Sequence, residues 1–386
     1  MSMRKKRCIW LFVVLLLTVG CKEEDVKEKP SPLVLEFKEV AVLNGGKADS
    51  GALHLTSPKD VKVDNEGRIY VSDTDQLAIK VFDQKGNFIQ SIGREGKGPG
   101  EFNSISAFAV NDGKLIAVDG RNRRIIYFDS SGNVLKTVKP NKDAMVWPGK
   151  LYQLSPNKLL INRKKPSAAG GTTNFQASAL HIFDENFETR FTSFAHVNDL
   201  MNANNEFVKL YNVNINAGHA VTADSSRIYF VPGIYDGHIY EFQKQRNGWV
   251  NTDTLNGSLA PDKAYTLVNN SNSLDGTIQF TVFSGGGPYI GKINSESLAL
   301  FTLDDGRLVH FSAQIADNKR ETKVEIFDQS GNMQGVGQLN DFSFSSDTQQ
   351  AKITSIWKDD NNRFYVIDTR NNPTVRIGQI EGLNDY

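Results

Sequence analysis

The strongest constraint on the fold is a stretch of sequence that repeats itself 46 residues later. Gly67–Asp73 aligns without gaps with Gly113–Asp119, and Val81–Asn87 aligns in the same way with Tyr127–Asn133. Both pairs of blocks share one offset, although other residues separate the blocks. Such agreement is hard to obtain by chance, so we expect the chain to be built from repeated structural units.

Each unit has the pattern of four short antiparallel strands joined by tight turns and longer loops. In the first unit, Asn65–Gly67 and Gln84–Asn87 favour hairpin turns. Four short strands that recur at intervals of about 45 residues are typical of a β-propeller blade. The strands predicted in the first unit are 59–64, 69–72, 79–82 and 88–92.

Four weaker copies follow the two clear ones, so the sequence predicts six blades. Their second and third strands are predicted at 158–162 and 180–184, 226–231 and 238–242, 306–311 and 323–328, and 362–368 and 374–379. The last copy lacks a fourth strand, whereas residues 34–43 resemble one. We therefore expect an all-β, six-bladed propeller of four-stranded antiparallel blades over residues 33–386, closed by the N-terminal strand. Closure of this kind removes the open sheet edges.

The first twenty residues have the features of a secretory signal. Arg4–Arg7 are basic, and Cys8–Val19 is a run of twelve apolar or small residues, shorter than the roughly 20 that a transmembrane helix needs. The run ends at Thr18–Cys21, which resembles the lipobox of bacterial lipoproteins. We expect residues 1–20 to be a lipoprotein signal peptide and Cys21 to carry the acyl anchor. The alternative is an ordinary signal peptide with an incidental cysteine.

Residues 21–32 are charged, contain proline and have too little apolar content to fold, so we expect a flexible tether. Lys22–Asp25 resembles the export signal of surface lipoproteins of the Bacteroidetes, although a linker in a periplasm-facing lipoprotein would have a similar composition. These features predict an outer-membrane lipoprotein that is either exposed on the surface or faces the periplasm.

Charge and cysteine content exclude further classes of protein. The 44 Lys and Arg residues are balanced by 44 Asp and Glu residues, which excludes a strongly basic nucleic-acid-binding protein. Removal of the signal would leave 40 basic and 44 acidic residues and a single cysteine, Cys21. No intrachain disulfide could then form, so the stability of the domain would depend on burial of its core.

The repeats resemble the NHL-type repeats of six-bladed propellers in the TolB-like superfamily. In the second unit, the residues at the positions of the family motif are Asp119, Asn122, Arg124 and Ile125. The connection Gly93–Phe102 is rich in glycine, as is usual between such repeats. With the lipobox, these motifs make the chain similar to six-bladed propeller lipoproteins of the Bacteroidetes. The resemblance implies a fold and a location, and it implies no reaction because one fold carries many functions.

The long predicted connections all belong to one face of the propeller. They join the second strand of a blade to the third, or one blade to the next, and they are 163–179, 195–217, 252–293 and 313–322. Insertions on one face usually mark a binding face, although neutral drift in loop length is the alternative. The rings of Phe175, Tyr211 and Tyr289 suit sugars or extended peptides, or else pack inward as a small cap.

Positive charge is predicted near the loops of several blades, at Arg121, Arg123, Arg163 and Arg370. These arginines could recognise an anionic ligand such as an acidic glycan, or they could form a solvated rim. His219 is expected on an inner strand, where it would either contact a ligand or be satisfied within the structure.

The sequence contains no pattern that predicts a catalytic residue, a resident metal or a cofactor. None of the six histidines lies at a metal-ligand spacing from another, and there is no Gly-x-Ser-x-Gly motif. Propeller lactonases and lyases, which the fold resembles, hold a metal at the inner strands, where the candidates here are Asp60, Asn216, His219 and Glu296. The aspartates that end equivalent strands, and are predicted to cap turns, are Asp73, Asp119 and Asp368.

These features favour a non-catalytic binding lipoprotein that presents its insertion-rich face to a glycan, a peptide or a protein partner. It would bind a membrane through the acyl anchor at Cys21 and would not bind nucleic acid. One alternative is a metal-dependent enzyme, similar to a lactonase or a lyase, with its site in the central channel. Another is a structural subunit of an envelope complex.

Overall fold

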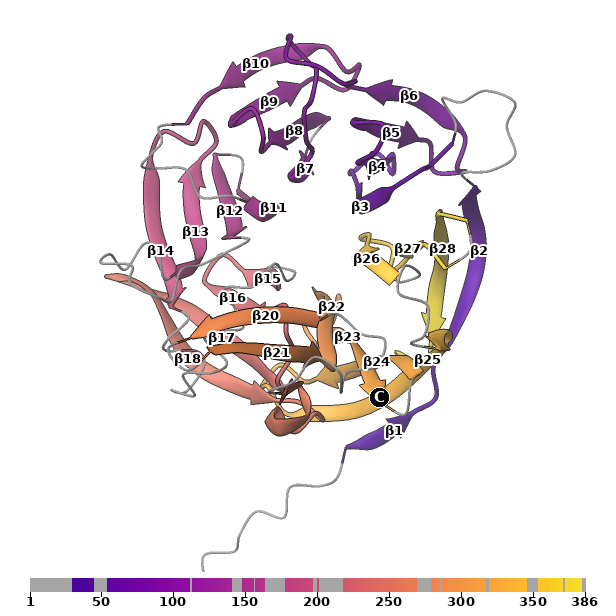
Figure 1. Cartoon of the computed structure of the whole chain (residues 1–386), viewed down its shortest axis with the longest axis vertical. Coiled ribbons are helices and arrows are strands. Elements are labelled where there is room, and N and C mark those ends of the chain that lie inside the picture. The colour runs from indigo at the N-terminus through magenta and orange to yellow at the C-terminus, as the bar shows by residue number, and fades with distance from the viewer. Residues whose placement is uncertain are drawn as a thin grey trace, which may run out of the picture.

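The strands of this computed structural model form a ring of six four-stranded antiparallel sheets, which confirms the predicted propeller (Figure 1). Within the described part of the chain, no helix is long and apolar enough to cross a membrane. The residues that the structure describes are 30–44, 54–111, 113–140, 148–155, 157–163, 178–196, 200, 218–268, 279–284, 287–316, 319–345, 353–370 and 372–383.

In blades 1 to 5 the strands follow one another in the chain from the centre of the ring to its outside. Blade 1 contains β3 (Pro58–Val63), β4 (Ile69–Asp73), β5 (Ala78–Phe82) and β6 (Phe88–Ile92). Blade 2 contains β7 (Ala107–Asn111), β8 (Lys114–Asp119), β9 (Arg124–Phe128) and β10 (Val134–Val138). Blade 3 contains β11 (Pro148–Ser155), β12 (Lys158–Arg163), β13 (Ser178–Asp184) and β14 (Arg190–His196).

Blades 4 and 5 have the same order of strands, and blade 6 takes its outermost strand from the N-terminal part of the chain. Blade 4 contains β15 (His219–Asp224), β16 (Arg227–Val231), β17 (His238–Gln245) and β18 (Gly248–Asn256). Blade 5 contains β22 (Ser295–Thr302), β23 (Leu308–Ala316), β24 (Lys319–Phe327) and β25 (Met333–Ser345). Blade 6 contains β26 (Ile353–Lys358), β27 (Phe364–Asp368), β28 (Thr374–Glu381) and β2 (Glu36–Asn44).

Apolar layers between neighbouring blades hold the ring together. The middle strands β4, β5 and β9 are buried at every position, whereas the outer strand β10 is mostly exposed. Between blades 2 and 3, for example, Ile116 and Ile125 pack in one cluster with Leu159 and Ile161. Side chains on both faces of a blade's sheet are buried, because a neighbouring sheet packs against each face. The continuous apolar runs of the middle strands follow from this arrangement.

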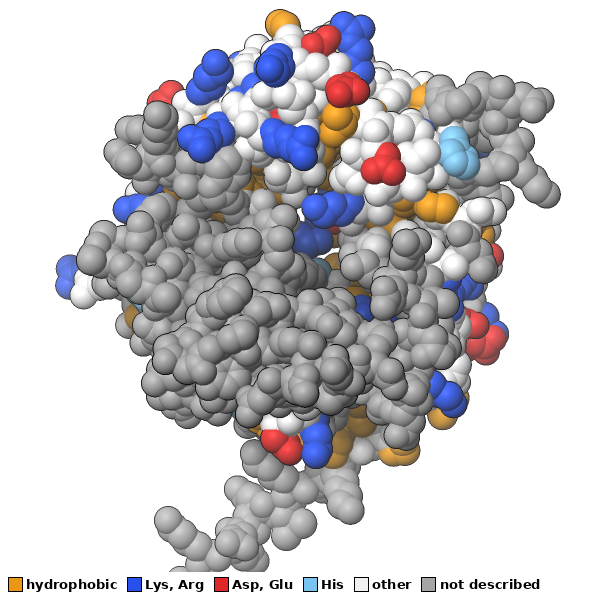
Figure 2. Space-filling model, in the orientation of Figure 1, with side chains coloured by type: hydrophobic (Ala, Val, Ile, Leu, Met, Phe, Trp, Pro, Cys, Tyr) orange, Lys and Arg blue, Asp and Glu red, His pale blue; other side chains and the backbone are white. Residues whose placement is uncertain are grey.

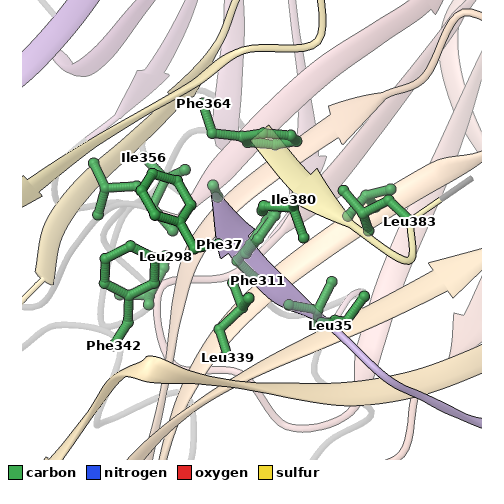
Figure 3. Close-up of a cluster of buried hydrophobic side chains, with 14 of the residues drawn as sticks. Leu35, Phe37, Leu298, Phe311, Leu339, Phe342, Ile356, Phe364, Ile380 and Leu383 are labelled. Carbon is green, nitrogen blue, oxygen red and sulfur yellow. The ribbon is translucent and has the colours of Figure 1, made fainter. Parts of the chain in front are cut away.

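The N-terminal strand closes the ring, as predicted. β2 pairs antiparallel with β28 over eight residues, from Glu36 opposite Glu381 to Asn44 opposite Thr374. The ring of Phe37 is buried and lies edge-on to Phe342, with the ring centres 4.9 Å apart. Figure 3 shows Phe37 within the apolar cluster that joins blades 5 and 6. The closing strand therefore contributes to the core and completes the sheet.

A second N-terminal strand was not predicted. β1 (Ser31–Leu33) pairs in parallel with β25 on the outside of blade 5. Its partners include Gly335 and Gly337, where an added Cβ atom would come within 2.4 Å and 2.7 Å of the Leu33 side chain. The two glycines therefore make room for Leu33 against the sheet. The last two residues of the expected tether, 31 and 32, belong to this strand.

Two of the predicted insertions contain strands. Between β18 and β22 the chain forms η1 (Pro261–Lys263) and a three-stranded sheet of β19 (Tyr265–Val268), β20 (Gln279–Ser284) and β21 (Gly287–Ile293). This insertion starts after Asn256, later than predicted. The predicted loop 313–322 is wrong, because β23 and β24 stay paired as far as Ala316 and Lys319. The hydrogen bonds of this longer hairpin satisfy the backbone.

The two faces of the ring differ. We call the face with the turns 64–68, 83–87, 129–133 and 328–332 the short-turn face; each of these turns closes with a backbone hydrogen bond. We call the opposite face, which carries the connections from second to third strands and from blade to blade, the insertion face. The sheet of β19, β20 and β21 belongs to a connection of the insertion face.

Candidate binding site in the central channel

The inner strands of the six blades surround the central channel (Figure 1). A cavity of about 310 Å³ is lined by residues of β3, β7, β11, β15, β22 and β26, that is, by every blade. This volume lies at the small end of the range for small-molecule sites. The cavity extends from Asp60 and Lys150 to Asn65 and Asp360, which belong to turns of the short-turn face, and to Asn111 at the end of β7.

One aspartate and two lysines meet in the channel. The Asp60 Oδ2 atom lies 3.5 Å from Lys62 Nζ, and its Oδ1 atom lies 3.6 Å from Lys150 Nζ. The Ser355 hydroxyl donates a 2.9 Å hydrogen bond to Asp60 Oδ1. Both ion pairs are longer than a charge-assisted hydrogen bond, which is about 2.7–2.9 Å. The carboxylate therefore holds the two ammonium groups loosely.

Aromatic rings support the Lys62 ammonium. Its Nζ atom lies 4.0 Å from the centre of the Trp357 ring and 5.6 Å from that of Tyr152, distances at which a cation is attracted to a ring face. The backbone N–H of Ala220 donates a 3.3 Å hydrogen bond to the Tyr152 hydroxyl oxygen, which fixes that ring. Blade 2 contributes Ala109, whose small side chain leaves space in the channel.

Burial and neighbouring charges shift the titration of this cluster. Burial raises the pKa of Asp60, but Lys150, Lys62 and the Ser355 hydroxyl outweigh burial and lower that pKa to about 2. Burial and repulsion from Lys150 lower the pKa of Lys62 to about 8, although Asp60 opposes the change. Burial, and then Lys150, lower the pKa of His219 well below its usual value. At neutral pH this cluster therefore has two cations, one anion and a neutral imidazole.

The comparisons with known proteins agree with the fold. The model of the family described as DUF5128, 6-bladed beta-propeller, matches residues 52–274, which is more than half of the chain. The chain belongs to this family. No curated protein matches the sequence. The family assignment states an architecture, so the side chains of this propeller must supply any argument about its ligand.

Solved structures with the same fold come from distant proteins. A member of the duf4221 family from Bacteroides vulgatus ATCC 8482 is 9% identical, with a TM-score of 0.54 and coverage of 90% of this chain and 98% of that chain. A protein of Bacteroides fragilis NCTC 9343 described as exported is 13% identical, with a TM-score of 0.51 and coverage of 88% and 85%. At these identities the likeness shows the fold alone.

Among the described members of the predicted ligand set, His219 lines the cavity in the channel, whereas Arg121, Arg123 and Arg370 do not line it. Arg121 and Arg123 are exposed beside the connection between β8 and β9, and Figure 2 shows Lys and Arg side chains gathered on the part of the face near β7–β10. Arg370 forms an ion pair of 2.5 Å with Asp368. Outside the described residues, or with side chains outside them, lie Cys21, Phe175, Tyr211, Arg163 and Tyr289.

Sequence reasoning missed most of the channel cluster. Lys62 follows Asp60 by two residues on one strand, so strand alternation could have placed both side chains in the channel. Lys150 and Tyr152 lie on β11, a strand for which no repeat signal was found, and Trp357 lies on the equally weak β26. The sequence pattern that repeats from blade to blade lies in the turns. The side chains of the inner strands differ between blades, so these strands carry no repeated pattern.

The expected turn aspartates cap backbone groups, as predicted. Asp73 accepts hydrogen bonds from the backbone N–H groups of Thr56, Ser57 and Gln76. Asp119 accepts from those of Asn103, Ser104 and Asn122, and Asp368 from that of Arg370. The three aspartates therefore stabilise loops of the scaffold.

The described residues do not fit a metal centre. No group of three or more His, Cys, Asp and Glu side chains that could hold a metal ion occurs among them. Asp60 and His219 share the cavity, but two lysines stand beside them and would repel a divalent cation. Glu296 instead pairs with Arg320 at 2.5 Å. Asn216 lies outside the described residues.

A buried Ser–His–Glu arrangement in blade 5 also resembles a catalytic site. Ser297 Oγ lies 3.1 Å from His310 Nε2, and His310 Nδ1 lies 3.0 Å from Glu325 Oε2. All three side chains are fully buried, so a substrate cannot reach the serine. Glu325 also accepts hydrogen bonds of 2.6 Å from the hydroxyls of Tyr235 and Ser258. The network therefore links blade 5 to blade 4 as a structural element.

Proposed function

We propose that this propeller is a non-catalytic binding lipoprotein of the cell envelope, anchored in the outer membrane through Cys21, that presents its insertion face to a glycan, a peptide or a partner protein. The observation that carries the proposal is the place where the N-terminus joins the ring. The exported protein of Bacteroides fragilis with the same fold supports an envelope location.

The first described residues lie towards the short-turn face. β25 starts after the turn 328–332 and runs away from that face. β1 is parallel to it, with Ser31 opposite Gly335, near the start of β25. β2 likewise begins with Glu36 opposite Glu381, at the short-turn end of β28. The chain therefore enters the ring at the short-turn face.

In this proposal, the entry point determines which face of the propeller lies nearer the membrane. Eight residues, 22–29, separate Cys21 from the first described residue, so nine Cα-to-Cα steps join the two, and an extended chain spans at most about 3.3–3.6 Å per step. The anchor is thus held within about 30 Å of the short-turn face. The insertion face then points away from the bilayer, where it is free to meet a ligand.

The repeat relationship forms part of the proposal. The residues at the positions of the NHL motif lie together, since Asn122 and Arg124 both donate hydrogen bonds to Asp119, of 2.7 Å and 3.3 Å. Arg124 also donates to the carbonyl oxygens of Lys97 and Glu101. These contacts hold the connection between β8 and β9 against the glycine-rich connection Gly93–Phe102. A repeat motif that stabilises the scaffold is expected to make contacts of this kind.

Two measurements test the proposal. Cys21→Ala should release the protein from the membrane fraction, because a stable anchor needs more than one acyl chain and this variant carries none. Single fluorophores on Ser330→Cys, at the short-turn face, and on Arg121→Cys, at the insertion face, form a matched pair. Quencher lipids should dim the first label more than the second. Membrane retention of Cys21→Ala, or stronger quenching at position 121, would contradict the proposal.

A further inference from the structure

The channel cluster has more positive than negative charge. The side chains of Lys62 and Lys150 are 7% and 12% exposed, and that of Asp60 is 12% exposed. Buried ammonium groups are costly and are normally balanced by carboxylates. Here two lysines share one carboxylate, and the neutral His219 adds no charge. The cluster is therefore suited to one additional negative charge between the lysines.

The remaining walls favour a monoanion over a phosphate. None of the described residues that line the cavity is an arginine, although arginine forks are the usual partners of phosphate. Asp64, Asp359 and Asp360 line the short-turn end with Lys358. Asp64 and Asp359 are paired with Arg68 and Arg363. With Lys358 beside Asp360, the charges at this end balance, so the short-turn end offers no further positive charge to a ligand with two or more negative charges.

The body of the ligand would meet both aromatic and amide groups. Trp357 and Tyr152 line the cavity near the lysines, and aromatic rings pack well against the C–H faces of sugar rings. The amide and hydroxyl groups that line the same cavity belong to Asn65, Asn111, Gln153 and Thr222. A volume of about 310 Å³ suits a single sugar ring rather than a chain of them.

We propose that the channel binds a sugar acid, with the ligand carboxylate between the Lys62 and Lys150 ammonium groups and the hydroxylated ring along the cavity. Asp60 and Ser355 position the lysines from the opposite side. The titratable groups that face Lys62 are Asp60, Lys150, Tyr152 and His219. A bound carboxylate stabilises the charged ammonium of Lys62, so binding takes up protons near pH 8, where the unliganded amine titrates.

The test is calorimetric titration of the full-length protein with D-glucuronate and D-galacturonate. The neutral parent sugars and glucose 1-phosphate serve as comparison ligands. Lys62→Met and Lys150→Met should each weaken binding of a sugar acid by about 10-fold or more, the usual effect of losing one charged hydrogen bond. Lys323→Met is the matched control, because Lys323 lies on β24, where it pairs with Glu321 and Gln338 and does not line the cavity. The affinity of this variant for a sugar acid should not change.

A second readout separates direct contact from a structural role. In the unmodified protein, affinity should fall as the pH rises above about 8. Binding heats in Tris and HEPES should differ by the proton taken up, and Lys62→Met should remove both effects. The melting temperature of each unliganded variant shows whether it is folded. The proposal would be overturned if no binding occurred at millimolar sugar acid, or if the neutral sugars bound with equal affinity. It would also be overturned if glucose 1-phosphate bound more tightly, or if both channel variants kept the affinity of the unmodified protein. None of these outcomes depends on the anchor at Cys21.

Discussion

Replacing Lys62 with methionine should stabilise the protein at neutral pH. The pKa of Lys62 is lowered from 10.5 to about 8, and one pKa unit corresponds to about 1.4 kcal/mol. The charged ammonium thus costs the folded state about 3 kcal/mol relative to the unfolded chain. Methionine keeps an unbranched stem and removes this charge, so we expect Lys62→Met to raise the free energy of unfolding by about 3 kcal/mol.

Loss of a buried partner could oppose this gain, because breaking a buried ion pair usually costs about 3–5 kcal/mol. That cost arises when the remaining charge has no partner. Asp60 keeps Lys150 at 3.6 Å and the Ser355 hydroxyl at 2.9 Å when Lys62 is replaced. The lowered pKa of Lys62 already includes its attraction to Asp60, so relief of the buried charge is the larger effect.

The difference between the two proteins should depend on pH with a definite sign. Between about pH 8 and 10.5 the unfolded chain keeps the Lys62 proton while the folded protein loses it. The unmodified protein therefore gains stability with rising pH over this window, relative to Lys62→Met, and the difference disappears above it. Urea unfolding at several pH values measures this, with Lys323→Met as the control. A destabilised Lys62→Met variant at neutral pH, or a difference that does not change with pH, would refute the reasoning.

Two further substitutions test the scaffold. Phe37→Ala in the closing strand should lower the free energy of unfolding by about 3–5 kcal/mol, because this ring is buried against Phe342; Val40→Ala, at a position 63% exposed, should change it little, and equal effects would contradict closure by β2. Glu325→Gln should cost about 3 kcal/mol or more in urea unfolding, since it leaves the buried donors of His310, Tyr235 and Ser258 poorly matched. Glu321→Gln, whose side chain is 26% exposed, should cost less than about 1 kcal/mol, and a cost as small for Glu325→Gln would argue against a structural network.

The fold could be predicted because turn chemistry repeats along the chain. Asp83, Asp129 and Asp328 each accept backbone N–H hydrogen bonds from the residues two and four positions later. The same Asp-x-x-Gly-Asn pattern marks these turns in the sequence. Local hydrogen bonds of this kind depend on adjacent residues, so they can be predicted without knowledge of the tertiary structure. The position of the closing strand followed from the missing fourth strand of the last blade.

The channel site could be predicted only in part, because its members come from different blades. Asp60 and His219 were identified as inner-strand residues, but Lys150, Tyr152 and Trp357 were not. Their proximity results from closure of the ring, which brings β3, β11, β15 and β26 around one cavity. β1 was missed for a similar reason, since its place on blade 5 depends on Gly335 and Gly337, which lie about 300 residues later in the chain.

The inner positions of the blades support a role of the channel beyond holding the ring together. The inner strand of every blade lines the central channel. Ala109 and Leu300 show that a small or apolar side chain is sufficient at such a position. Blades 1 and 3 instead place lysines there, and burial lowers the pKa of Lys62, so its charged form destabilises the folded state at neutral pH. A residue that lowers stability where an apolar one would suffice is typical of a functional site. The difference between blades therefore supports the proposed ligand site in the channel, whereas the repeated turn aspartates belong to the scaffold.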